Sequence, residues 1–289
     1  MVLREVLRNG AQRLMEGGIP ASQFAAELLL MHTLGCDRTE LHSHPEREIS
    51  LNLAERYSTF ISERLTGKPT QYITGHQEFW GLDFEVTPDV LIPRPETEGL
   101  VETVLDLVKR HDAARDAEPR IVDVGTGSGC IALVLASELP GAEIVAIDIS
   151  PAALRVAKRN AARLGLAHRV KFRKDDLLTG FLAETERAFD FVVSNPPYVC
   201  AGELDQVQRE VKEFEPRLAW GGLERGDEVY RRLFPQALRL LKPGGYVAVE
   251  IGYRQREAVV GLLGPEWTGI EVRPDLAGIA RVVIARNAL

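Results

Sequence analysis

The N-terminal part of the chain carries apolar residues at helical spacing. The stretch VLREVLRNGAQRLM keeps this period until a glycine pair interrupts it, and a second such stretch, ASQFAAELLLMHTL, ends at Gly35. Asp37 and Ser50 stand where N-caps would begin two more helices. Residues 1–75 are therefore predicted to form a small helical-bundle domain.

Aromatic and β-branched residues replace the helical period in the next stretch, QEFWGLDFEVTPDVLIPRP. Gly81 lies in its middle, which predicts a β-hairpin or paired short strands. Pro93 and Pro95 then hold the intervening Arg94 in extended backbone. Residues 76–95 are accordingly predicted to be a hairpin connector between two domains.

From Arg120 onward, short apolar runs alternate with helical segments. This alternation predicts a mainly parallel sheet covered by helices on both faces, so the fold class is α/β over residues 96–289. The runs are RIVDVG, AEIVAID, VKFRKDD, FDFVVSN, GGYVAVEIG, GIEVRP and ARVVIA.

The overall charge and the cysteine content narrow the classes of function. A net charge of -7 and a pI near 5.5 argue against a broad basic face, so no stable nucleic-acid binding is expected. Cys36, Cys130 and Cys200 are widely spaced and odd in number, which indicates neither a disulfide framework nor a metal site. Without an apolar stretch long enough to span a bilayer, the chain is expected to be soluble and cytoplasmic, with no membrane partner.

A glycine-rich loop lies between a buried strand and a helix in the stretch IVDVGTGSGCIALVLA. Gly125, Gly127 and Gly129 let a ligand approach the backbone where a side chain would collide. A dinucleotide fingerprint would need glycine or alanine at the position of Cys130, and the spacing fits neither a phosphate loop nor a serine-hydrolase elbow. The loop therefore indicates a bound nucleoside or, as the plain alternative, a tight turn.

Acidic residues lie at or near the ends of the first three runs of the predicted sheet. Asp148 ends the second run, where an acid can accept both hydroxyl hydrogens of a bound ribose; it could instead cap the next helix, although Ser150 is better placed to do so. Asp123 is expected to support the glycine loop or to contact the amino-acid part of the ligand. Asp175 and Asp176 end the third run, where they fit either an adenine amine or a solvated turn.

The fourth run is followed by a polar, proline-stiffened corner, SNPPYV. Asn195 offers a side-chain carbonyl acceptor, Pro196 offers a backbone acceptor with no N–H beside it, and Tyr198 offers a flat ring. Together they fit a planar NH2 group and orient its nitrogen toward an electrophile beside the glycine loop. A methyl group on a sulfonium is such an electrophile. The plain alternative is a turn in which Asn195 serves only the backbone.

These motifs resemble those of the protein-(glutamine-N5) methyltransferases that modify peptide chain release factors. The resemblance rests on IPRPETE, IVDVGTGSGCIALVLA and SNPPYV, with EPRLA and VEIGYRQ later, and it extends over most of the chain. It implies a seven-stranded Rossmann-like class I methyltransferase domain, S-adenosyl-L-methionine as the cofactor, and a release factor as the protein partner. The helical domain would help to dock that partner.

The same resemblance assigns roles to individual residues. The cofactor would be bound by Gly125, Thr126, Gly127, Ser128, Gly129, Asp148, Asp176, Leu177 and Asn195. The substrate glutamine would be held by Asn195, Pro196, Pro197, Tyr198 and Arg94, of which Asn195, Pro196 and Tyr198 would be catalytic.

Some positions depart from the family's pattern. Leu177 stands where the family often has an aromatic residue, which leaves the stacking partner of the adenine open. Ala280 replaces an acid in DLAGIAR, and WGGLERGDEVYRR is irregular beside the usual glycine-rich form.

Two other functions compete with this interpretation. An N6-adenine or N2-guanine nucleic-acid methyltransferase would present the same planar amine, but it usually needs a basic groove or a recognition domain. A non-catalytic module that binds the cofactor or a ribosomal partner would have no need to orient an amine.

Overall fold

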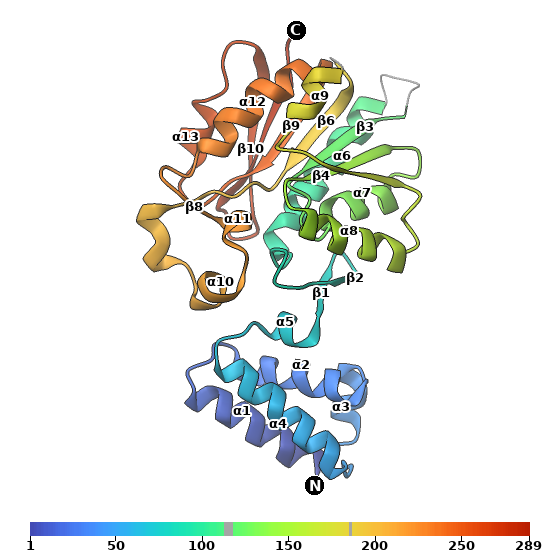
Figure 1. Ribbon diagram of the computed structural model, residues 1–289, viewed down its shortest axis with the longest axis vertical. Helices are drawn as coiled ribbons and strands as arrows, with labels where there is room; N and C mark the ends of the chain where they lie inside the picture. The colour runs from blue at the N-terminus through green and yellow to red at the C-terminus, as the bar shows by residue number, and fades with distance from the viewer. Residues whose placement is uncertain (113–117, 185–186) are drawn as a thin grey trace. The chain divides into compact units, whose positions relative to one another are not determined.

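Helices form the N-terminal part of the chain, as the apolar spacing predicts. The computed structural model describes residues 1–112, 118–184 and 187–289, which form two compact units: Met1–His76 with Gln208–Phe214, and Gln77–Val207 with Glu215–Leu289. The helices of the first unit are α1 (Leu3–Glu16), α2 (Ser22–Leu34), α3 (Arg38–Ser43), α4 (Leu51–Leu65), α5 (Thr70–Thr74) and α10 (Arg209–Phe214) (Figure 1).

The helical unit is built around a small apolar core. Leu14 of α1, Leu29 and Leu30 of α2 and Ile61 of α4 are completely buried in it. The two predicted N-caps are confirmed, because the Asp37 carboxylate accepts from the Glu40 backbone N–H at 2.8 Å and the Ser50 hydroxyl accepts from that of Leu53 at 3.4 Å. These bonds satisfy backbone donors that the first turn of a helix leaves free.

The helical unit also includes a segment from far along the sequence. Arg64 is almost fully buried in α4, and its guanidinium forms an ion pair with Glu210 of α10. The guanidinium of Arg209 donates to the carbonyl of Thr66 at 3.2 Å. The α/β domain predicted over residues 96–289 includes Gln208–Phe214, whereas the structure groups this segment with the helices, where Glu210 pairs with the buried Arg64.

A two-stranded hairpin, β1 (His76–Phe79) and β2 (Leu82–Glu85), follows the first helices. Its turn residues Trp80 and Gly81 both have positive φ, 55° and 72°, as the right-handed twist of a two-residue hairpin requires. Phe79 and Phe84 are buried against the helices of the second unit.

A sheet of seven strands, in the order β10-β11-β9-β6-β3-β4-β5, forms the centre of the second unit. The pairs among β9, β6, β3, β4 and β5 are parallel, while β11 runs antiparallel to both of its neighbours. The seven strands are β3 (Arg120–Val124), β4 (Glu143–Asp148), β5 (Val170–Lys174), β6 (Phe189–Ser194), β9 (Leu241–Glu250), β10 (Trp267–Pro274) and β11 (Ala280–Asn287). Each contains one of the seven predicted runs, or most of it, so the α/β prediction is confirmed.

Helices cover both faces of this sheet. The helical segments of the unit are η1 (Pro95–Thr97), α6 (Glu98–Asp112), α7 (Cys130–Glu138), α8 (Pro151–Arg163), α9 (Thr179–Glu184), η2 (Ala201–Gln206), α11 (Arg217–Trp220), α12 (Glu228–Leu240) and α13 (Arg256–Val260), and a short pair, β7 (Val199–Cys200) and β8 (Gly221–Leu223), lies apart from the main sheet.

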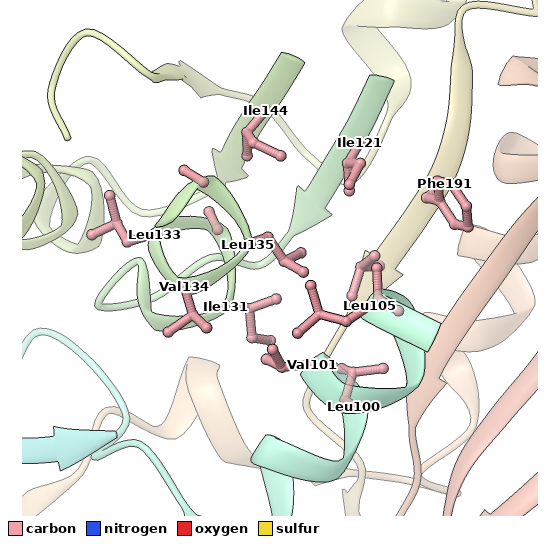
Figure 2. Close-up of a cluster of buried hydrophobic side chains, with 14 of the residues drawn as sticks. Leu100, Val101, Leu105, Ile121, Ile131, Leu133, Val134, Leu135, Ile144 and Phe191 are labelled. Carbon is pink, nitrogen blue, oxygen red and sulfur yellow. The ribbon is translucent and has the colours of Figure 1, made fainter. Parts of the chain in front are cut away.

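Neighbouring residues of one strand belong to opposite faces. Figure 2 shows Ile121, Ile144 and Phe191 of the sheet in one cluster with side chains of α6 and α7, including Leu105 and Leu135. On the other face, Val122 and other strand residues pack against α12 and α13. Because side chains alternate along a strand, a buried strand must be apolar on both faces, which explains the continuous apolar runs.

The strand order reverses between β3 and β6, and the register there aligns three strand ends. Val124 of β3 pairs with Ile147 of β4 on one side and with Ser194 of β6 on the other. The residues that follow, Gly125, Asp148 and Asn195, therefore lie at one level at this edge of the sheet, Asp148 as the last residue of β4. In open α/β sheets, ligands bind at such a reversal, beyond the carboxyl ends of the strands.

Candidate active site

A cavity of about 220 Å³ lies at these strand ends. Gly125, Asp148 and Asn195 all line it, and so do Arg94 and Thr97 from the segment before α6. Pro216, Leu218 and Ala219, from the stretch EPRLA, add a further part of its wall. Residues from motifs that are far apart in the sequence thus lie together at one site within the second unit.

The glycine loop leaves open space beside its backbone. Gly125 and Gly127 have φ of 77° and 56°, a region that favours glycine, and a Cβ at either position would meet no atom within 4 Å. Both residues, with Thr126 and Ser128, line the cavity, so a side chain there would fill space next to the ligand. Gly129 instead packs closely on α8, since a Cβ would lie 3.1 Å from that of Ala157.

Asp148 is held in a fixed orientation beside this loop. Its carboxylate accepts from the backbone N–H of Gly127 at 2.9 Å and from that of Ser150 at 2.8 Å, and burial raises its pKa. The cap of α8 is Ser150, whose hydroxyl accepts from the backbone N–H of Ala153 at 3.2 Å. Asp148 therefore retains lone pairs on a cavity wall, as a ribose diol requires.

Asp123 lies under the same loop and is completely buried. Its Oδ2 accepts from the Thr126 hydroxyl at 2.6 Å. Burial raises the pKa of this carboxyl to about 7. The Thr126 bond ties the loop to β3, which agrees with the supporting role expected for Asp123.

The two acids after β5 differ in their surroundings. Asp175 accepts from the backbone N–H of Gly180 through both carboxylate oxygens, whereas Asp176 forms an ion pair with Arg232 at 2.6 Å. Leu177 lines the cavity beside them, and the half-exposed Ile149 contributes a second apolar side chain. Aliphatic residues thus occupy the part of the wall where the family often has an aromatic residue.

The residues of the NPPY corner face different ways. Asn195 and Pro197 line the cavity, and Pro196 is buried. The hydroxyl of Tyr198 donates to Oε1 of Glu250, the last residue of β9, at 3.4 Å. The tyrosine is thus anchored to the end of the neighbouring strand.

Arg94 both lines the cavity and forms an ion pair with Glu215. The Glu215 side chain is almost completely buried and also accepts from the backbone N–H of Ile92 at 3.2 Å. This pair joins IPRPETE to EPRLA, so Arg94 has a structural partner as well as a place on the wall of the cavity.

Thr97 and Glu250 were missed as site residues by sequence reasoning. Both belong to motifs quoted for the family, IPRPETE and VEIGYRQ, and both are buried. The signal that could have found Glu250 is an acid at the carboxyl end of a buried strand beside Asn195, because Val249 pairs with Ser194.

The residues of the cavity fit S-adenosylmethionine. The open glycine loop leaves room for a ligand against the backbone, and Asp148 offers acceptors for a ribose. No group of three or more His, Cys, Asp or Glu suited to a metal ion occurs in the described ranges. No helix of 1–112, 118–184 or 187–289 is long and apolar enough to cross a membrane.

A sheet of this order with a glycine loop and an acid at its reversal defines a class I S-adenosylmethionine-dependent methyltransferase. Comparison with known proteins supports this class. The family described as "Methyltransferase domain" matches residues 115–259, and "PrmC N-terminal domain" matches residues 5–75. The N-terminal domain of human METTL16 in complex with SAH has the same fold, with a TM-score of 0.51 and 19% identity over 84% of this chain and 88% of that one.

Relatives that match over nearly the full length of the chain identify its family more specifically. The release factor glutamine methyltransferase of Koribacter versatilis is 49% identical, covering 99% of both chains. That of Moorella thermoacetica is 43% identical, covering 99% of this chain and 98% of its own. The chain belongs to the release factor glutamine methyltransferase family.

Proposed function

We propose that this enzyme transfers a methyl group from S-adenosylmethionine to the side-chain amide nitrogen of the glutamine in the Gly-Gly-Gln motif of peptide chain release factors. The observation that carries the proposal is the common level of Gly125, Asp148 and Asn195 at the ends of three neighbouring strands. Asn195 lies on the wall of this cavity, where its side-chain carbonyl would accept from a planar amine. The relatives support a glutamine of a release factor as the owner of that amine.

The residues of the site would act by positioning the cofactor and the substrate amide. Gly125, Thr126, Gly127, Ser128 and Gly129 would hold the cofactor with Asp148, and Asp176 and Leu177 would lie near its base. Bound S-adenosylmethionine would supply an electrophilic methyl carbon on a sulfonium, whose C–S bond breaks to leave S-adenosylhomocysteine. Asn195 Oδ1 and the Pro196 carbonyl would accept the two amide hydrogens, with Pro197, Tyr198 and Arg94 shaping the substrate pocket.

An amide nitrogen is a poor nucleophile because its lone pair is delocalised, so orientation is the main catalytic device here. Once the nitrogen has gained the methyl group, its proton becomes acidic and leaves to water. A cytoplasmic location follows from the proposed substrate, since translation termination takes place there.

The direct test is a methylation assay with a purified release factor in one reaction and unmodified DNA and ribosomal RNA in others. Mass spectrometry should find the methyl group on the glutamine of Gly-Gly-Gln. A methyl group on a base amine would contradict the substrate while retaining the chemistry. Asn195→Ala should lower turnover roughly 100-fold or more while the chain still binds the cofactor; unchanged turnover would exclude the role of the corner.

The helical unit is proposed to dock the release factor. Phe24 of α2 is a large apolar side chain left about half exposed there. In the full-length chain, Phe24→Ser should raise KM for the release factor and leave the cofactor Kd unchanged. An unchanged KM would argue that docking does not use this face of the unit.

A further inference from the structure

A continuous series of hydrogen bonds leads from Asn195 into the core of the second unit. The Asn195 side-chain NH2 donates to the Thr97 hydroxyl oxygen at 3.1 Å. Thr97 in turn donates to Oε2 of Glu250 at 2.7 Å. The other oxygen of this carboxylate accepts from the Tyr198 hydroxyl at 3.4 Å, so Glu250 connects both polar side chains of the corner.

The direction of these bonds follows from the number of available hydrogens. A threonine hydroxyl has one hydrogen, and an ionised carboxylate can only accept. Thr97 therefore gives its hydrogen to Glu250 and can only accept from Asn195. That acceptance requires the NH2 end of the asparagine to point inward, which leaves its carbonyl oxygen for the cavity.

We infer that Thr97 and Glu250 are positioning residues that fix which end of the Asn195 amide faces the substrate. The inference rests on the proposed function, because it assumes that the substrate is an amine donor. The two ends of an asparagine amide have nearly the same shape, so packing alone does not choose between them. The choice is made by a carboxylate two side chains away.

The orientation decides the chemistry that the corner can perform. With the carbonyl outward, Asn195 accepts a hydrogen from the substrate NH2 and aligns its nitrogen. With the NH2 outward, two donors would face each other, and the substrate amide would be repelled or rotated. The buried acid thus sets the polarity of a pocket that it does not line.

The surroundings of Glu250 make its charge state depend on pH. Its carboxyl is faced by Arg281 of β11, Glu96 of η1, Tyr198 of the corner, Tyr230 of α12 and Cys130 of α7. Burial raises the pKa of Glu250 to about 7. A protonated Glu250 can itself donate to Thr97, which frees the threonine hydrogen for the carbonyl of Asn195 and removes the constraint on the amide.

The experiment compares Thr97→Val with Thr97→Ser in the full-length enzyme, using a purified release factor and S-adenosylmethionine. Valine keeps the shape of threonine without its hydroxyl, and serine restores the hydroxyl. Thr97→Val should lower kcat roughly 10- to 100-fold, and Thr97→Ser should recover most of that loss. Calorimetric Kd values for the cofactor, measured for both variants, separate a loss of turnover from a loss of cofactor binding.

A wild-type kcat in Thr97→Val would overturn the inference, as would an equal loss in the valine and serine variants. If Thr97→Val does not fold, the pH profile of Glu250→Gln decides. Wild-type kcat should rise with pH through about 7, and this limb should vanish in the glutamine variant; an unchanged limb would refute the role of Glu250. Failure of the proposed function is distinct, because the wild-type enzyme itself would then not methylate the release factor.

Discussion

Asp148 accepts a hydrogen bond from the backbone N–H of Gly127 at 2.9 Å, so the acid that ends β4 holds the glycine loop after β3. The carboxylate has a second bond to the backbone N–H of Ser150 and is oriented before any ligand binds. This preorganisation lowers the conformational cost of binding.

Asp148→Asn should weaken cofactor binding about 10- to 100-fold, because the amide places an NH2 group against a backbone donor and loses a charged acceptor. Isothermal titration calorimetry with S-adenosylmethionine measures the effect. Glu184→Gln is the matched control, since Glu184 is an exposed acid paired with Arg173 and should bind as wild type does. Equal affinities of Asp148→Asn and wild type would refute ribose recognition by Asp148.

The glycine loop can be tested with two alanine substitutions that carry similar backbone strain. Gly127 and Gly165 have φ of 56° and 71°, and a Cβ would meet no atom within 4 Å at either position. Both alanine variants should lose about 1–2 kcal/mol of stability in urea unfolding. Only Gly127 lines the cavity, so only Gly127→Ala should also weaken cofactor binding. A similar loss of affinity in Gly165→Ala would mean that strain, not contact, is responsible.

The ion pair of Arg94 should contribute more to stability than that of Arg232, although both residues line the cavity. Arg94→Ala leaves Glu215, whose side chain is 1% exposed, without its cation, and should lower the free energy of unfolding by about 2 kcal/mol. Asp176 and Arg232 are about half exposed, so Arg232→Ala should cost below about 1 kcal/mol. Urea unfolding of both variants makes the comparison, and the reverse order would contradict it.

Asp123 should make the stability of the ligand-free enzyme depend on pH. Its carboxyl has a pKa of about 7 in the fold, raised by burial from the ordinary value of 3.8. Between about pH 4 and 7 the unfolded chain ionises this group while the folded chain does not, so stability falls as pH rises through that window.

Asp123→Asn removes this titration. Relative to wild type, the variant should become more stable by on the order of 4 kcal/mol from pH 4 to pH 8. Urea unfolding at both pH values measures the difference. A difference that does not change with pH would show that the carboxyl is already ionised in the folded enzyme.

Much of the fold could be predicted because parallel strands buried on both faces must be continuously apolar. Runs such as FDFVVSN therefore mark their own strands, and the polar residue after each run marks the ligand edge. The start of β9 could not be predicted, since it begins at Leu241 before the glycine pair and pairs through an irregular register with Phe189.

The predicted cofactor-binding residues reach the cavity because of their positions at the ends of strands. The roles of the missed residues, Thr97 and Glu250, depend instead on partners that are distant in the sequence. Gly125 and Asp148 lie in the cavity because their strands are neighbours. The direction of the Tyr198 side chain is set by Glu250, and that of Asn195 by Thr97, whose hydroxyl lies 98 residues earlier in the sequence. No local pattern contains such information.

The inclusion of α10 in the helical unit has a consequence for synthesis on the ribosome. Met1–His76 emerges first, and residues 77–207 must be translated before Gln208–Phe214 appears. At the usual rate of elongation this takes roughly ten seconds. During that time the nascent helical unit lacks Glu210, the carboxylate partner of Arg64. The first unit to begin folding is thus completed only after four of the seven strands of the second unit's sheet, β3 to β6, have been made.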